Sequence, residues 1–104
     1  MNSDSPEHAE QLLGCICDLF GLERCNEHPN NVFAGELFEI MRNKRIGEHG
    51  HLALQTADVE YAIAYFAGKG IGLREETIRR DEAGKINFAY LDVDLGGFAV
   101  HLTT

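Results

Sequence analysis

Three side chains of types that bind transition metals each stand in a short run of apolar or small residues: Glu39, His51 and His101. Two imidazoles and one carboxylate form the facial triad that binds non-haem iron, and the same set suits Zn, Ni, Mn or Co. A carboxylate in an apolar strand needs water, a partner or an ion, because its desolvation is costly. The pattern therefore indicates a site for a divalent metal ion, provided that three neighbouring strands align these side chains on a common face.

Each of these residues also has an interpretation without a metal. Glu39 faces solvent if the sheet is open on that side. Without a metal, His51 is a core histidine bonded to a backbone carbonyl, or a surface residue. His101 is in that case an exposed residue of an edge strand. His49 shares a strand face with His51 at a spacing of two. It is the one nearby titratable candidate for a catalytic base, and the alternative is a surface or supporting group.

The spacing of apolar residues, together with capping and helix-ending residues, predicts two helices. Ser5 caps a first helix over 6–20, which begins with proline and ends before Gly21. Thr56 or Asp58 caps a second helix, and a pair of glycines ends it. Alternating or apolar runs bounded by turn residues predict the strands. The sequence is compatible with the presence or the absence of a short additional strand at 22–25. The expected strands are 32–34, 37–41, 49–55, 71–78, 86–92 and 98–102.

These elements predict one α+β domain over 1–104. Residues 49–104 form a complete βαβββ module, and residues 6–42 form an incomplete αββ(β) module that lacks an opening strand. The two segments are a faint internal repeat at an offset of about 60 residues. The expected architecture is a mixed, cupped sheet with two helices on one face.

Composition bounds the partners and the compartment. Nine basic residues against 17 acidic ones give a net charge of −8, which argues against nucleic-acid binding. No window approaches the roughly 20 apolar residues of a membrane span. The start of the chain lacks the features of a secretory signal, and three cysteines read as free thiols in a reducing compartment, so we expect a cytoplasmic protein. An anionic ligand is repelled at long range and must be held by local groups.

The motifs GHLAL at 50–54, GGFAVHL at 96–102 and FAGELFEIM at 33–41 occur in an order that resembles the vicinal-oxygen-chelate superfamily of glyoxalase, bleomycin-resistance and dioxygenase-like proteins. In that family, two βαβββ modules form a cupped sheet around a divalent metal, with ligands from the first and last strands of each module. The resemblance implies that His51 is a first-strand ligand and Glu39 a last-strand ligand. His101 falls where the family usually has Glu, and the remaining ligand belongs to the opening strand that this chain lacks.

The resemblance implies two classes of function. The first is a metal-dependent lyase, isomerase or dioxygenase-like enzyme whose Zn, Ni, Mn or Fe(II) ion chelates two adjacent oxygens of a small keto acid or diol. The second is a non-catalytic module that binds a small anionic metabolite or serves for dimerisation. The open edge left by the missing strand favours a homodimer, because natural proteins cover or pair such edges.

A narrower resemblance concerns the segments 32–35, 47–51 and 96–102. They are similar to a small domain fused behind keto-deoxy-phosphogluconate-type aldolases in some bacteria. This similarity implies a role in sugar-acid metabolism and an association with an aldolase-type enzyme.

Overall fold

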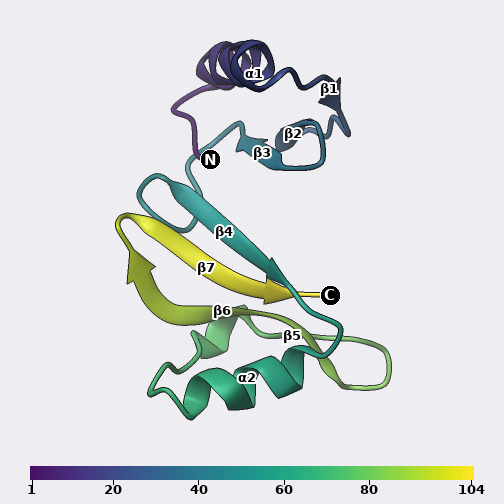
Figure 1. Ribbon diagram of the computed structural model, residues 1–104, viewed down its shortest axis with the longest axis vertical. Helices are drawn as coiled ribbons and strands as arrows, with labels where there is room; N and C mark the ends of the chain where they lie inside the picture. The colour runs from purple at the N-terminus through teal and green to yellow at the C-terminus, as the bar shows by residue number, and fades with distance from the viewer. The chain divides into compact units, whose positions relative to one another are not determined.

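The computed structural model describes all 104 residues, which form two compact units, Met1–Gly50 and His51–Thr104. The class is α+β, as expected, with two helices and two sheets (Figure 1). The elements of the first half are α1 (Pro6–Phe20), β1 (Arg24–Cys25), β2 (Asn31–Ala34) and β3 (Phe38–Met41). Those of the second half are β4 (Gly50–Gln55), α2 (Val59–Ala67), a 3-10 helix η1 (Glu75–Thr77), β5 (Arg79–Arg80), β6 (Ile86–Leu95) and β7 (Phe98–Thr103).

Helix α1 has the predicted bounds and the predicted caps. The Ser5 side chain accepts a hydrogen bond from the backbone N–H of His8, and Gly21 adopts the left-handed conformation, with φ 65°, that closes the helix. One side of α1 packs on the sheet of unit 1. The buried residues of this contact are Ala9, Leu13, Ile16, Val32, Ala34 and Ile40.

The sheet of unit 1 is antiparallel, in the order β1-β2-β3, and includes the strand that the sequence left open at 22–25. The register places Val32 opposite Ile40 and Phe33 opposite Glu39. Since Val32 and Ile40 belong to the core under α1, alternation directs Glu39 to the other face of the sheet.

The outer edge of β3 is covered by the first residues of the chain. The Met1 ammonium donates to the Glu39 carbonyl at 2.8 Å, and the Met41 N–H donates to the Met1 carbonyl at 2.8 Å. A residue that bonds in this way to both neighbours of Ile40 follows the pattern of a parallel ladder. The Ser3 hydroxyl, 1% exposed, continues the contact by donating to the Met41 carbonyl at 2.5 Å.

The sheet of unit 2 has the order β4-β7-β6-β5. Strands β5, β6 and β7 pair antiparallel, whereas β4 runs in the same direction as β7, so the sheet is mixed (Figure 1). Helix α2, capped by the Asp58 carboxylate, packs along one side. The core between them is formed chiefly by Val59, Ile63, Phe66, Leu91, Val100 and Leu102.

Two expectations about the sheets are wrong. The single cupped sheet with two helices is instead two sheets, each packed against a helix of its own. Met1 occupies the edge of β3, and residues 42–49 form no strand. The expected strand at 71–78 is interrupted by η1. There the Thr77 hydroxyl, rather than a strand carbonyl, accepts the N–H of Tyr90, so the ladder to β6 is broken.

Neither helix has the length and apolar character needed to cross a membrane; the longer, α1, has 15 residues.

Candidate functional site

His51 and His101 lie side by side in unit 2, on the neighbouring strands β4 and β7. Their ring centres are 5.2 Å apart. His101 lies between Val100 and Leu102, which pack under α2, so its side chain is on the opposite face of the sheet. His101 is 7% exposed and His51 is half-buried. The predicted pair is thus brought together on the side of the sheet that the helix does not cover.

The separation of the two imidazoles fits a shared metal ion. A Zn–N bond of about 2.1 Å puts each ring centre about 3.2 Å from the metal. Two imidazoles at an angle of about 90–110° on one ion then have ring centres about 4.5–5.2 Å apart. The observed 5.2 Å lies at the tetrahedral end of this range. The donor set is also appropriate, because neutral imidazole suits Zn, Ni and Fe.

Two aromatic residues of β6 border this pair, and the sequence analysis did not single them out. Tyr90 is the register partner of His101, and their ring centres are 5.0 Å apart. The Phe88 ring centre lies 4.6 Å from that of His101 and 5.6 Å from that of Tyr90. Alternation along β6 places Phe88 and Tyr90 on one face, but only the pairing with β7 shows that this is the face of His101.

Glu39 belongs to unit 1, where it lies on the sheet face that α1 does not cover. Its carboxylate accepts a hydrogen bond from the Asn31 amide at 2.5 Å. Burial lowers the pKa of the Met1 ammonium, and the negative charge of Glu39 partly opposes this shift. Within either unit, no group of three His, Cys, Asp or Glu side chains is arranged to hold a metal ion. Glu39 as the third ligand stays a prediction.

His49 precedes β4 rather than belonging to it, because the strand begins at Gly50. It is exposed, and its backbone carbonyl accepts the N–H of Asn2 at 2.9 Å. Its role as a catalytic base stays a prediction. The three cysteines are free thiols, as expected, and Cys25 donates to the Gly35 carbonyl at 2.9 Å.

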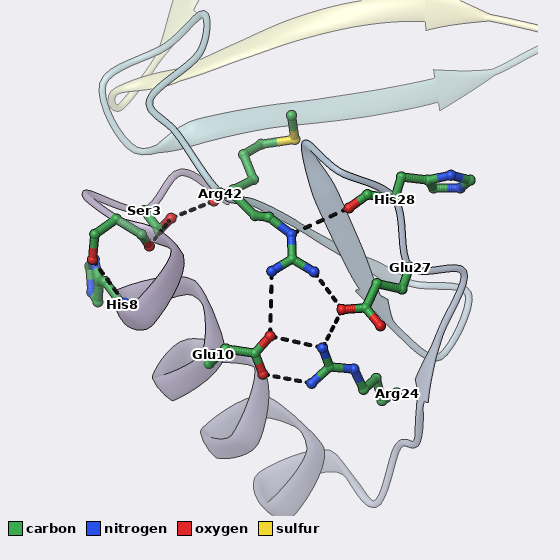
Figure 2. A network of polar contacts seen from close by, with 9 residues as sticks. Ser3, His8, Glu10, Arg24, Glu27, His28 and Arg42 are labelled. Carbon is green, nitrogen blue, oxygen red and sulfur yellow. Dashed lines mark hydrogen bonds and ion pairs between the residues drawn. The ribbon is translucent and has the colours of Figure 1, made fainter.

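A second cluster of charged groups lies in unit 1 (Figure 2). Arg24 donates to Glu10 at 2.6 and 2.8 Å and to Glu27 at 2.5 Å. Arg42 donates to Glu27 at 2.7 Å and reaches Glu10 at 3.5 Å. The hydrogen bonds from Arg24 hold the pKa of both carboxyl groups below the ordinary value. The network ties α1 to β1 and to the residue that follows β3.

This charged network is a structural clamp rather than a ligand site. A shallow hollow of about 520 Å³ lies beside it, lined by Pro6, Glu27, His28, Pro29 and Arg42. Both guanidinium groups are already matched by two carboxylates, so the hollow offers no uncompensated charge to an anion or a cation. The histidine face of unit 2 is therefore the stronger candidate for function.

The chain matches no protein-family model, no curated protein and no solved structure.

Proposed function

We propose that this protein binds a divalent metal ion through His51 and His101 and uses it to hold a small oxygen-rich metabolite, a keto acid or sugar acid. The observation that carries the proposal is the pair of imidazoles on adjacent strands, 5.2 Å apart, on the face opposite the helix. Glu39 is the proposed third ligand. With three protein ligands, positions remain open for two neighbouring oxygens of a metabolite.

The order of elements in unit 2 supports a vicinal-oxygen-chelate plan. A strand, a helix and three further strands follow one another, and the first strand pairs in parallel with the last. Unit 1 has the same order after the opening strand: a helix followed by three strands, which in unit 1 are antiparallel. Met1 bonds to the edge of β3 as an opening strand would. In both units the proposed ligands are on the sheet face away from the helix. We propose that the two units are related modules of this plan.

The bound metal would polarise a carbonyl or hydroxyl oxygen and stabilise enolate-like charge. The residues of the chain supply position and environment. Tyr90, 8% exposed, and Phe88 place ring surface against His101, which fixes its orientation and limits the access of water. This environment strengthens electrostatic interactions at the site.

A second candidate is a non-catalytic binding module. The observation that favours it is that, within unit 2, no third His, Cys, Asp or Glu side chain joins the two histidines in a group arranged to hold a metal ion. In this role the same face binds a small anionic metabolite and the chain acts as an accessory to a sugar-acid enzyme of the aldolase type. A homodimer is compatible with both the enzymatic and the non-catalytic role.

Metal uptake by the full chain, purified without a histidine tag or chelator, tests the proposal. The protein is dialysed against Zn, Ni, Mn or Fe(II), and bound metal is measured by elemental analysis in wild type and in His51→Ala, His101→Ala and Glu39→Gln. His28→Ala is the matched control, since His28 is an exposed histidine of unit 1. We expect about one ion per chain, lost in the first two variants, reduced in the third and retained in the control. Unchanged uptake in His51→Ala and His101→Ala would contradict the proposal. Turnover of a keto acid by the loaded protein separates an enzyme from a binding module.

A further inference from the structure

We propose that one end of unit 1 is a docking surface for a basic, apolar segment of a partner protein. This surface, the apolar end of unit 1, consists of Leu19 and Phe20 at the end of α1 and of Leu37 and Phe38 where the turn 35–37 meets β3. None of these residues is a proposed metal ligand, so the surface is independent of the metal site.

Large apolar side chains of this surface are exposed to water. Leu19 is 72% exposed, Phe20 59% and Leu37 76%. The ring centres of Phe20 and Phe38 lie 5.1 Å apart, so side chains from α1 and from β3 meet in one surface. A single exposed leucine is ordinary in a folded protein, whereas apolar side chains gathered in one place mark an interaction site.

The fold of unit 1 does not itself cover the end of α1. Leu19 and Phe20 continue, by one further turn, the apolar stripe of Leu12, Leu13 and Ile16. Those three residues pack in the core beneath the helix, whereas Leu19 and Phe20 extend beyond it. The exposed end of the stripe is therefore suited to a contact with another molecule.

The charges around the apolar end of unit 1 are negative. The acidic residues Asp18, Glu23 and Glu36 belong to the two segments that form the surface, and all three are exposed. Helix α1 has no basic residue in its last turn, so the negative end of its dipole lacks a compensating cation. Arg24, the next basic residue along the chain, is already bound to two carboxylates of the charged network.

These charges decide the class of partner. A second copy of the chain carries the same acidic residues and the same net charge of −8, so like charges disfavour self-association through this surface. An anionic membrane surface is repelled for the same reason. A protein segment that combines apolar side chains with Lys or Arg matches both features. Its apolar side chains cover the exposed leucines, and its cations complement the acidic residues and the end of the helix.

A synthetic amphipathic peptide of leucine and lysine is the probe, and the same peptide with glutamate in place of lysine is its comparison. Both are labelled, and the full chain is titrated into each at low and at physiological salt while fluorescence anisotropy is followed. The test variant combines Leu19→Ser with Leu37→Ser, which removes exposed side chains outside the buried core. Leu95→Ser, at an exposed leucine of β6, is the matched control.

A second pair of variants tests the charges. Glu23→Gln combined with Glu36→Gln neutralises the surroundings of the surface, and Glu76→Gln combined with Glu82→Gln changes the net charge equally at exposed positions of unit 2. Circular dichroism checks that every variant is folded.

We expect the combined Leu19→Ser and Leu37→Ser changes to weaken binding of the lysine peptide by at least about tenfold, because they remove apolar contact area. The Glu23→Gln and Glu36→Gln changes should weaken binding less and reduce its dependence on salt. Both controls should match the wild type, and the glutamate peptide should not bind.

Two kinds of result overturn the proposal. The first is no binding of the lysine peptide by the wild type, or equal affinity of the wild type and the double serine variant. The second is a dimer of the wild-type chain, or binding to vesicles of anionic phospholipid, that the two serine changes abolish. Such a result would assign the apolar end of unit 1 to a different occupant.

Discussion

The imidazoles of His51 and His101 come from strands at opposite ends of unit 2 in sequence, yet their ring centres lie 5.2 Å apart. The parallel pairing of β4 with β7 produces this neighbourhood. Because α2 covers the other face, the pair is set apart from the apolar core. The fold thus places two side chains of a type that can ligate metals together on a face that its own helix leaves uncovered.

Acid should destabilise unit 1 through its charged network. The pKa values of Glu10 and Glu27 are lowered in the folded state. The network therefore stabilises the folded state of unit 1 fully at pH values above the unfolded carboxyl pKa of 4.5. This stabilisation is lost as the pH falls through the lower folded values. Urea midpoints measured from pH 7 to pH 2 should therefore fall more steeply for the wild type than for Arg24→Gln. Arg45→Gln, outside the network, should follow the wild type; a slope that is unaffected by Arg24→Gln would contradict this account.

Gly50→Ala should destabilise the chain strongly. Gly50 has φ +146°, and an added Cβ would lie 2.8 Å from the Met1 Cα, a contact that backbone cannot relieve without moving. We expect a loss of about 1–3 kcal/mol in the free energy of unfolding. Gly14→Ala is the control, because it lies within α1 with no atom near the new methyl group, and it should gain roughly 0.5–1 kcal/mol. Chemical denaturation measures both, and a Gly50→Ala protein as stable as wild type would show that Met1 does not cover the edge of β3.

Leu102→Ala should test the core that supports the site. Leu102 is 1% exposed and packs between the sheet and α2, so its truncation should cost about 2–5 kcal/mol of unfolding free energy. Leu95, 57% exposed on β6, is the comparison, and Leu95→Ala should change stability by less than about 0.5 kcal/mol. Equal effects on the denaturation midpoint would mean that α2 does not pack on β7 as described.

Local signals account for what the sequence predicted well. The bounds of α1 follow from Ser5, the proline at the first helical position and Gly21, all of which act within one turn of the helix end. Strand alternation likewise predicted which neighbours share a face with His51 and with His101 within each strand, but only the pairing of β4 with β7 places the two imidazoles side by side.

Long-range contacts account for what the sequence missed. Nothing local indicates that Met1 bonds to β3, since the two segments are distant in sequence. Thr77 breaks the expected strand 71–78 by accepting the N–H of Tyr90, a contact that depends on the position of β6. Nothing local indicates that Arg79 contacts the ring of Phe88, because this contact depends on the register of β5 with β6.

The most direct test of the central claim is a Zn²⁺ titration of ¹⁵N-labelled full-length protein, followed through the ring nitrogens of its five histidines. The account predicts that the signals of His51 and His101 shift together and are complete at about one equivalent of Zn²⁺, while those of His8 and His28 do not move. Shifts confined to His8, His28 or His49, or no shift at any histidine, would contradict the assignment of the metal to this pair.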